Sequence, residues 1–367
     1  MPAVEDARPR ASPDGDFAAR LLVWFDQHGR HDLPWQHPRT PYRVWLAEVM
    51  LQQTQVQTVI PYFQRFEATF PTLQALAHAE LDQVLALWSG LGYYSRARNL
   101  HRAAQICVER HGGELPLDLA AICALPGIGR STAGAILAQA HGARHPILDG
   151  NVRRVLARFG AIAGEPSSST VQQQLWALSA AMLPEHRLAD YTQALMDLGA
   201  IVCTRKRPAC QLCPLTAACQ ARIQGRVDEL PQARARRLRP LRSCTLLWVQ
   251  DDQQRVLLQR RPPVGIWAGL WSLPEDQTEQ AAMTTLAGLG IVGAAPRELA
   301  SIRHEFTHFS LDIQVRAVDA ASAGIADLDL RWLSVTEALN LGLPQPLRRL
   351  FEAHTSGVLS QSLTPPD

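Results

Sequence analysis

Four cysteines crowd into 17 residues and constrain the folding of this chain more than any other feature. Cys203, Cys210, Cys213 and Cys219 follow the spacing C-x6-C-x2-C-x5-C. In a chain without signs of secretion, clustered cysteines favour a metal or cluster site over disulfides. Four thiolates on one compact loop can bind Zn²⁺ tetrahedrally or hold a [4Fe–4S] cluster, and the spacing alone does not choose between them.

Length and composition are those of a globular protein with more than one domain. The chain has 367 residues, of which 47% are hydrophobic and 19% charged, and this excludes wholesale disorder. No apolar run is long enough for a membrane span, and the first residues lack the apolar region of a signal peptide. We therefore expect a soluble, cytoplasmic protein with no membrane partner.

Hydrophobic periodicity divides the chain into five parts. After a disordered N-terminal tail at 1–16, helical patterns run without interruption and predict an all-α domain over 17–221. An Arg-rich linker follows at 222–242. A β-hairpin pattern at 243–259, a helix near 278–288, a strand near 308–317 and a helix near 345–354 then predict an α+β module over 243–355. Residues 356–367 are expected to fray.

The linker concentrates positive charge in a chain whose net charge is only +2. Its seven arginines stand against Asp228 and Glu229 alone. Such a basic linker could bind along a polyanion such as DNA, or it could simply be solvated, and the sequence does not decide between these interpretations.

A glycine turn at 125–134 has the form of a helix-hairpin-helix. Gly127 and Gly129 allow a tight turn, and a helix is predicted to begin close to Ser131. The free N–H groups of that helix would point outward and bind one DNA phosphate without reading sequence. The same pattern also occurs in plain helix connectors, but the flanking helices and the cysteine loop favour the phosphate site.

Two carboxylates are candidates for general acid–base chemistry. Glu48 lies in the middle of an apolar helical run, where burial would raise its pKa and keep it protonated at neutral pH. Asp149 precedes another helix. Cleavage of a glycosidic bond needs such a pair, one to protonate the leaving group and one to stabilise positive charge on the sugar. The structural alternatives are an Arg-paired helix glutamate and an N-cap.

Two loops carry side chains suited to entering a base stack. Residues 52–55 read Gln-Gln-Thr-Gln at the end of a helix, and residues 91–95 form a Gly-aromatic loop. Amides and aromatic rings beside a basic surface can wedge between bases. Helix capping and core packing explain the same residues equally well.

Taken together, these motifs resemble the MutY family of adenine DNA glycosylases, within the endonuclease III-like helix-hairpin-helix superfamily. The similarity runs from about Leu33 to Leu350. It rests on Leu-Pro-Trp-Gln at 33–36, Glu-Val-Met-Leu-Gln-Gln-Thr-Gln at 48–55, Gly-Leu-Gly-Tyr-Tyr at 90–94, the hairpin at 125–134, Leu-Asp-Gly-Asn-Val at 148–152 and the cysteine loop at 203–219. The resemblance implies a multi-domain protein, an all-α helix-hairpin-helix glycosylase domain with a [4Fe–4S] loop followed by an α+β Nudix-like domain.

The resemblance also implies roles for individual residues. Glu48 matches the general acid, Asp149 the residue that stabilises the oxocarbenium-like sugar, and Asn151 its hydrogen-bonding partner. The four cysteines match the ligands of a [4Fe–4S] cluster, which now outweighs zinc. The residues implied to contact DNA or its bases are Trp35, Gln36, Gln53, Leu91, Gly92, Tyr93, Gly127, Gly129, Ser131, Thr307 and His308. Thr307 stands where relatives often carry serine, so the hydroxyl is kept and a methyl is added.

Two departures from related enzymes sharpen the expected reaction. Lyase relatives place a lysine directly after the hairpin as a Schiff-base nucleophile, whereas this chain has Ser131, and its only lysine is Lys206. Active Nudix hydrolases need a glutamate-rich helix to hold metal. The corresponding stretch here, 275–290, has only three acidic residues, Glu275, Asp276 and Glu279. We therefore predict a monofunctional glycosylase whose C-terminal domain binds rather than hydrolyses.

The favoured hypothesis is a monomeric, nucleoid-associated base excision repair enzyme. It would flip adenine out of 8-oxoguanine:adenine or guanine:adenine mispairs in double-stranded DNA and hydrolyse its N-glycosidic bond. The alternatives are a thymine-glycol or abasic-site lyase, a non-catalytic redox-sensing DNA-binding protein and a nucleotide-pool hydrolase. The lyase is disfavoured by Ser131, and the hydrolase by the missing metal-binding glutamates.

Overall fold

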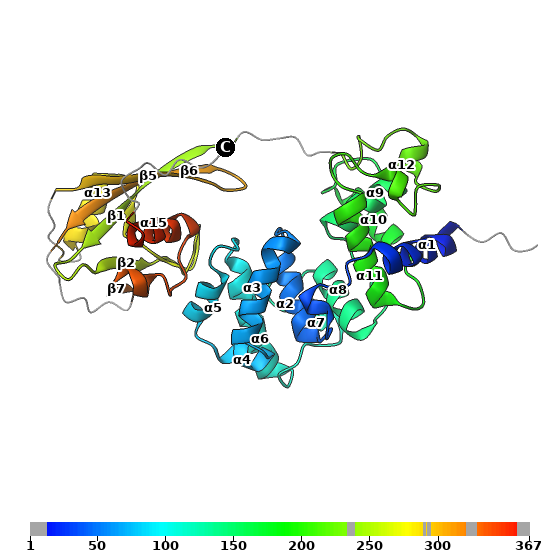
Figure 1. Ribbon diagram of the computed structural model, residues 1–367, viewed down its shortest axis with the longest axis horizontal. Coiled ribbons are helices and arrows are strands. Elements are labelled where there is room, and N and C mark those ends of the chain that lie inside the picture. Colours follow the sequence, from blue (N-terminus) through cyan, green and yellow to red (C-terminus); the bar gives the residue numbers. More distant parts are fainter. Residues whose placement is uncertain (1–12, 233–238, 289–290, 292–294, 321–328, 358–367) are drawn as a thin grey trace, which may run out of the picture. The chain divides into compact units, whose positions relative to one another are not determined.

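The computed structural model describes residues 13–232, 239–288, 291, 295–320 and 329–357 (Figure 1). The chain divides into two compact units, Met1–Glu67 with Ala103–Arg236 and Ala68–Arg102 with Arg237–Asp367. Sequence periodicity predicted one continuous helical domain over 17–221. The packing instead groups 68–102 with the C-terminal module.

Every element described in the first unit is a helix, as the periodicity predicts. The elements that lie in it or cross its boundaries are α1 (Pro13–His28), η1 (Pro34–Gln36), α2 (Pro41–Leu51), α3 (Val56–Thr69), α6 (Ser95–Arg110), α7 (Leu119–Cys123), α8 (Arg130–His141), α9 (Gly150–Phe159), α10 (Ser169–Ala181), α11 (Leu188–Asp197), η2 (Leu198–Val202), η3 (Cys210–Leu212) and α12 (Gln220–Ile223). Helix α1 begins at Pro13, three residues before the predicted end of the N-terminal tail at 16, and residues 1–12 lie outside the described part.

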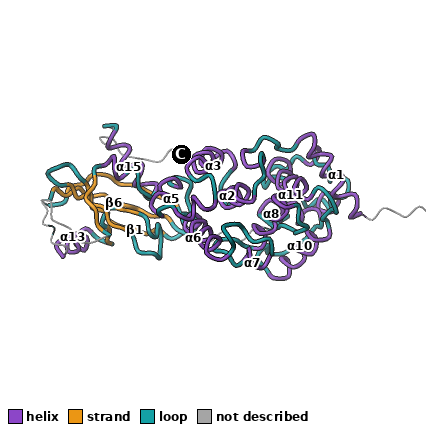
Figure 2. The backbone as a smooth tube through the Cα atoms, turned by 90° about the horizontal axis from the view of Figure 1, so that it is seen from below, coloured by secondary structure: helices purple, strands orange, loops and turns teal. Residues whose placement is uncertain are grey.

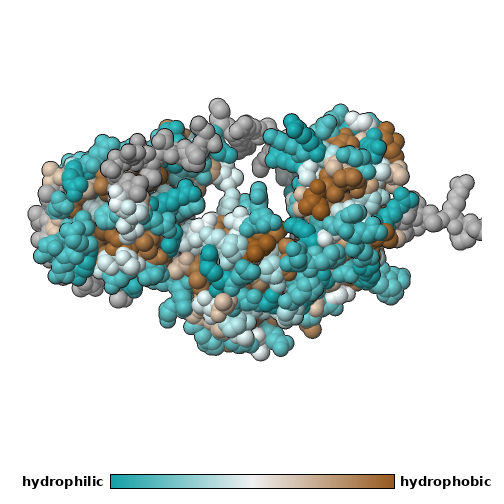
Figure 3. All heavy atoms as spheres, in the orientation of Figure 1, coloured by the Kyte–Doolittle hydropathy of each residue, from teal (hydrophilic) through white to brown (hydrophobic). Residues whose placement is uncertain are grey.

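Burial of apolar helix faces holds one end of the first unit together. Phe17, Leu21 and Phe25 of α1 pack with residues of α9, α10 and α11 in a single core. Next to this core, the buried carboxylate of Asp197 accepts hydrogen bonds from the backbone N–H and the guanidinium of Arg30. Figure 3 shows mostly hydrophilic surface, with apolar patches in the region of α9 and α10. The ion pair between Arg30 and the buried Asp197 fixes the segment after α1 against α11.

The second unit combines a mixed sheet with helices. Its elements are α4 (Leu73–His78), α5 (Leu81–Trp88), β1 (Leu241–Gln250), β2 (Val256–Arg260), β3 (Trp271–Ser272), β4 (Glu275–Asp276), α13 (Glu279–Gly288), β5 (Arg297–Glu305), β6 (Ser310–Asp319), β7 (Leu330–Leu333), α14 (Val335–Ala338) and α15 (Gln345–Thr355). The strand order is β3-β2-β1-β6-β5, with β4 on β1 and β7 on β2. Figure 2 shows the strands gathered in this unit alone among the described residues.

The predicted hairpin, strand and helices of this module are present, but its central pairing was not foreseen. Strands β1 and β2 pair antiparallel, while β1 also runs parallel to β6 from Leu241↔Ser310 to Gln250↔Asp319. Two apolar clusters form on the sheet, one that includes Phe351 of α15 and one that includes Leu286 of α13. The sheet is therefore packed between helices. Of the predicted frayed tail, only 356 and 357 are described.

None of the helices within the described residues combines the length and the apolar character needed to cross a membrane.

We predict that Gly342→Ala destabilises the second unit. A Cβ at this position would lie 2.6 Å from Cβ of Leu85, an atom that cannot move without its backbone. Overpacking of this kind costs about 1–3 kcal/mol, so thermal denaturation should show a lower Tm.

Gly288→Ala is the matched control, because a Cβ there meets nothing within 4 Å at the end of α13. This substitution should leave the Tm unchanged or raise it slightly. Equal Tm values for the two variants would contradict the close approach at Gly342.

Candidate functional site

Glu48 lies on α2 with its carboxyl group directed at α8. The flanking residues Ala47 and Val49 are buried, and Glu48 itself is partly buried. Its Oε1 accepts a hydrogen bond of 2.8 Å from the Nε2 amide of Gln139. Burial, reinforced by the nearby Asp149 carboxylate, raises the pKa of Glu48 to about 7 against the lowering effect of Gln139. The group therefore keeps a proton close to neutral pH.

Asp149 is the N-cap of α9. Its Oδ1 accepts a hydrogen bond of 2.7 Å from the backbone N–H of Val152. Burial raises the pKa of Asp149, while the N–H groups of Val152 and Asn151 and the charges of Arg154 and Arg153 oppose the rise. The N-cap interpretation is thus correct, and it is compatible with the predicted pairing because Asp149 also lies near enough to Glu48 to raise its pKa.

The two carboxyl groups therefore differ in what surrounds them. Glu48 has one amide donor, whereas Asp149 has backbone donors at a helix N-terminus and two arginines nearby. A helix N-terminus and cations favour a charged carboxylate. The raised pKa of Glu48 and the donors and arginines around Asp149 set the two groups apart, and glycosidic cleavage requires two carboxyl groups in different roles.

Gln139 and Arg154 are site residues that sequence analysis did not single out. Gln139 is 5% exposed within an apolar run of α8, and a lone amide in such a run was the available signal. The guanidinium of Arg154 donates from Nη2 to Oδ1 of Asn151 (2.8 Å) and from Nε to the carbonyl of Cys203 (2.6 Å). It also donates to the carbonyl of Gly199. Arg154 therefore joins the start of α9 to the cysteine loop.

The hairpin has the geometry expected of an anion site. Gly127 has φ +78°, a left-handed conformation that favours glycine, and Gly129 is the N-cap of α8. The first N–H groups of a helix have no carbonyl partner within it and can bind a phosphate. Gln52 Nε2 donates to the Gly127 carbonyl (3.3 Å) and to Oγ1 of Thr132 (3.4 Å), so α2 supports the turn.

Ser131 has a structural contact at the position that a lysine occupies in lyases. Its Oγ accepts a hydrogen bond of 2.9 Å from the backbone N–H of Leu148. This contact fixes the residue before Asp149 to the start of α8. Ser131 thus positions the backbone at the catalytic candidates, in addition to its predicted place beside DNA.

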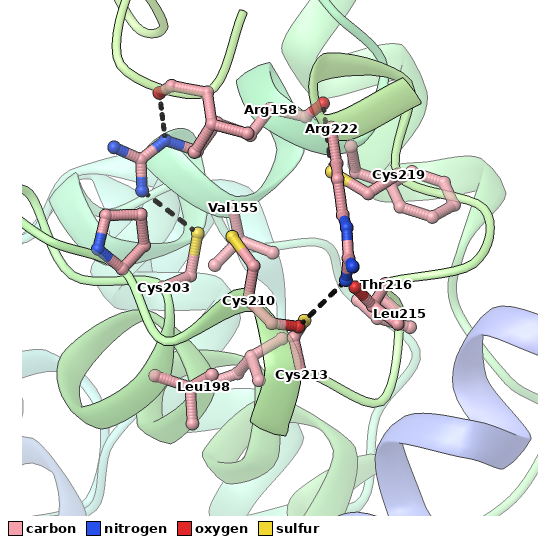
Figure 4. Close-up of a pocket in the computed structure, with 14 residues that line it drawn as sticks. Val155, Arg158, Leu198, Cys203, Cys210, Cys213, Leu215, Thr216, Cys219 and Arg222 are labelled. Carbon is pink, nitrogen blue, oxygen red and sulfur yellow. Dashed lines mark hydrogen bonds between the residues drawn. The ribbon is translucent and has the colours of Figure 1, made fainter. Parts of the chain in front are cut away.

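The four clustered cysteines line one cavity (Figure 4). Apolar side chains complete it, among them Val155, Leu198 and Val202. Arg158 Nη1 donates to Cys203 Sγ at 3.3 Å, and Cys219 Sγ donates to the Arg158 carbonyl at 3.5 Å. Among the described residues, no group of three or more His, Cys, Asp or Glu side chains is arranged to hold a metal ion. The thiols stand around a shared space.

The two loop residues predicted to enter a base stack share an uncommon backbone conformation. Gln53 has φ +59° and Tyr93 has φ +49°. Non-glycine residues in the left-handed region carry strain and cluster at functional sites. Both residues therefore remain candidates for a functional role, and their entry into a base stack stays a prediction.

The second unit brings Tyr93 to another predicted site residue. The Tyr93 hydroxyl shares a hydrogen bond of 2.7 Å with Oγ1 of Thr307, and both side chains are exposed. Leu91 is buried, Gly92 has φ +75°, and His308 is exposed beside Thr307. The hydroxyls of Tyr93 and Thr307 are therefore exposed and close enough to contact the same ligand.

Trp35 and Gln36 are both buried. Trp35 packs edge-on against Phe63 at 5.5 Å between ring centroids. The Gln36 amide donates to the Arg30 carbonyl (2.9 Å) and accepts from the N–H of Leu33 (3.3 Å). These contacts give both residues a structural role, and their predicted part in a base pocket stays a prediction.

We predict that Glu48→Gln stabilises the protein more at high pH than at low pH. Below the unfolded pKa of about 4.5, Glu48 is protonated in both states, so its ionisation does not affect stability. Between about 4.5 and about 7, only the unfolded chain loses the proton, and stability falls as pH rises. The neutral amide avoids this loss, so the Tm gain should grow from about pH 5 to about pH 8.

Asp118→Asn serves as the control, because that carboxylate caps α7 at the surface. A Tm gain for Glu48→Gln that is equal at both pH values would show that Glu48 ionises normally.

Two family models match this chain, one over helical segments and one over the sheet module. Residues 46–181 match the HhH-GPD superfamily base excision DNA repair protein family, and residues 245–353 match the NUDIX domain family. The chain is similar to a solved thermostable thymine-DNA glycosylase, with 25% identity and a TM-score of 0.53 over 58% of this chain and 97% of that one.

Similarity to curated relatives extends over nearly the whole chain. An adenine DNA glycosylase of Buchnera aphidicola is 34% identical, covering 92% of this chain and 97% of the relative. An adenine DNA glycosylase of Mus musculus is 36% identical, covering 93% of this chain and 79% of the relative. The chain belongs to the adenine DNA glycosylases, enzymes that hydrolyse the N-glycosidic bond of adenine in base excision repair.

Proposed function

We propose that this enzyme is a monofunctional glycosylase that removes adenine opposite 8-oxoguanine or guanine in double-stranded DNA, acting as a monomer. The observation that carries the proposal is Glu48, whose pKa of about 7 leaves a proton available beside Asp149. A general acid works best when its pKa lies close to the operating pH.

The chemistry follows from this pair of carboxyl groups. The bond between the sugar and adenine breaks with its electrons going to the base, and Glu48 donates its proton to a ring nitrogen of that base. Positive charge then develops on the sugar, next to Asp149 at the N-terminus of α9. Water adds to the sugar, and its proton returns to Glu48. Asn151 supports the sugar-stabilising carboxylate through its backbone N–H, while its side-chain oxygen accepts from Arg154.

Ser131 supports hydrolysis over lyase chemistry. A lyase needs an amine that attacks the sugar to form a Schiff base. The Ser131 hydroxyl instead accepts the Leu148 N–H, and the single lysine, Lys206, lies in the cysteine loop. We therefore propose that strand cleavage is not part of this reaction.

The C-terminal module is proposed to bind 8-oxoguanine without hydrolysing nucleotides. Two of the three acidic residues at 275–290, the stretch that would hold metal in a Nudix hydrolase, are paired with arginines, Glu275 with Arg261 and Glu279 with Arg316. Asp276 accepts from the Gln277 N–H at 2.7 Å. These contacts occupy carboxylates that a hydrolase would use for metal, whereas Tyr93 and Thr307 expose hydroxyls for recognition.

We also propose that Cys203, Cys210, Cys213 and Cys219 hold a [4Fe–4S] cluster. The fit rests on four thiols around one cavity, with apolar walls and an arginine N–H on Cys203 Sγ. A bound cluster would cross-link the loop through four bonds and offer one-electron chemistry. Through Arg154, the same loop supports the segment that carries Asn151.

Single-turnover assays on duplexes with one 8-oxoguanine:adenine pair test the proposed reaction. The wild-type enzyme should release free adenine, with strand breaks only after alkali. Glu48→Gln should bind the duplex but lower the release rate by about 100-fold or more, because it cannot donate the proton. Asp118→Asn is the control that leaves the site intact.

Strand breaks without alkali, or borohydride trapping of a covalent DNA adduct, would contradict a monofunctional reaction. Retained DNA binding with no adenine release from wild-type protein would favour a non-catalytic, redox-sensing role.

The cluster predicts equal amounts of bound iron and acid-labile sulfide in protein purified without oxygen. Cys213→Ser should lose both and lower the Tm, because a ligand to the cross-link is removed. Cys107→Ser is the control, since Cys107 is buried in α6 outside the loop. Stoichiometric zinc without sulfide would overturn the assignment.

A further inference from the structure

Arg348 of α15 reaches across the second unit to the loop that carries Tyr93. Its Nε donates to Oγ of Ser89 at 2.7 Å, and its Nη2 donates to the carbonyls of Leu339 (2.7 Å) and Leu341 (3.2 Å). The guanidinium thus connects three segments, namely α15, the chain after α14 and the end of α5. Ser89 is 9% exposed, so this connection is largely shielded from water.

The Leu343 carbonyl accepts two hydrogen bonds from the same loop. Ser89 Oγ donates to it at 3.2 Å, and the hydroxyl of Tyr94 donates at 2.7 Å. Tyr94 is 6% exposed and Leu343 is fully buried. Hydrogen bonds that are buried and satisfied in this way specify one arrangement, because any other leaves polar groups unpaired.

Further contacts fasten the segment 68–102 at α5 and at α6, on either side of the loop. The carboxylate Oδ2 of Asp82 accepts from Nη2 of Arg260 (2.9 Å) and from Nε1 of Trp271 (3.1 Å). Nη1 of Arg98 donates to the Ala268 carbonyl at 2.6 Å. The segment is thus held to the sheet module by polar contacts on each side of the loop.

Within the loop, the backbone around Tyr93 is also fixed. Trp88 Nε1 donates to the Gly92 carbonyl (3.1 Å), and Arg96 Nη2 donates to the carbonyls of Leu91 (3.1 Å) and Gly92 (3.0 Å). Because the loop carbonyls are hydrogen-bonded to side chains that flank the loop, the loop moves as a rigid unit with Ser89 and Tyr94. The placement of Tyr93 therefore depends on where Ser89 and Tyr94 are held.

We infer that Arg348 is a positioning residue for lesion recognition. It holds the loop at Ser89 and thereby sets the distance between the hydroxyls of Tyr93 and Thr307, which lie 2.7 Å from each other. The inference rests on the proposed function, because it assigns Tyr93 and Thr307 to the recognition of 8-oxoguanine. Arg348 itself touches neither residue and acts through the loop.

The test compares the full chain on 8-oxoguanine:adenine and guanine:adenine duplexes. Arg348→Met keeps the length of the side chain and removes its donors. The preference for 8-oxoguanine:adenine in single-turnover rate should fall about tenfold, which corresponds to about 1.4 kcal/mol of discrimination. Arg348→Lys, which restores a donor and the charge, should recover part of the preference.

Arg297→Met is the matched control for loss of one arginine in this module. Arg297 begins β5, at the opposite end of the β5–β6 hairpin from Thr307, and pairs with Asp319. The Arg297→Met variant should keep the wild-type preference for 8-oxoguanine:adenine over guanine:adenine duplexes. Ser89→Ala provides an independent variant, because it removes one hydroxyl from the same connection with little loss of volume.

A double-mutant cycle separates positioning from a general loss of structure. Tyr93→Phe removes the hydroxyl that meets Thr307, so adding Arg348→Met to it should lower the preference little further. Additive losses, or an Arg348→Met variant with lower Tm but unchanged preference, would overturn the inference. So would an unchanged preference in Ser89→Ala.

The two proposals fail in different ways. A wild-type enzyme that cleaves both duplexes equally would refute the proposed lesion preference. A wild-type preference that falls in Tyr93→Phe but survives in Arg348→Met and Ser89→Ala would leave the proposed function intact and refute the role of Arg348.

Discussion

The chemistry proposed for the first unit depends on a carboxyl group that keeps a proton near neutral pH. A carboxyl in water gives up its proton far below pH 7, so Glu48 must be withdrawn from water and placed beside negative charge. Helix α2 provides the burial, and Asp149 at the start of α9 provides the charge. Because these two helices are distant in sequence, the hairpin, α8 and Ser131 all serve to hold them in place.

Hydrogen bonds around the site offset the desolvation of two buried carboxyl groups that lie close together. Gln139 gives Glu48 a hydrogen-bond donor, and Val152 gives Asp149 another. Arg154 uses its guanidinium on Asn151, Gly199 and Cys203 together. A buried polar group without a partner would cost about 1–3 kcal/mol, and each of these contacts avoids that penalty. The cysteine loop is consequently part of the support of the catalytic candidates.

Sequence patterns were sufficient to predict features that depend only on residues close together in the sequence. The cysteine spacing, the glycine turn at Gly127 and the helical periods depend on neighbouring residues, and all appear where predicted. Glu48 and Asp149 could be nominated from their local settings. Gln139 and Arg154 could not, because their importance comes from partners far along the chain. The parallel pairing of β1 with β6 is non-local in the same sense, since either strand alone fits many partners.

The grouping of 68–102 with the sheet module was the least predictable feature, and it changes how the enzyme divides its work. Periodicity assigns α4 and α5 to the helical domain, since helices look alike whatever they pack against. The contacts of Asp82, Ser89 and Tyr94 with Trp271, Arg348 and the Leu343 carbonyl join this segment to the sheet module, and no local pattern predicts them. One unit therefore holds the carboxyl pair proposed to break the bond, and the other holds both hydroxyls proposed to read the opposite base.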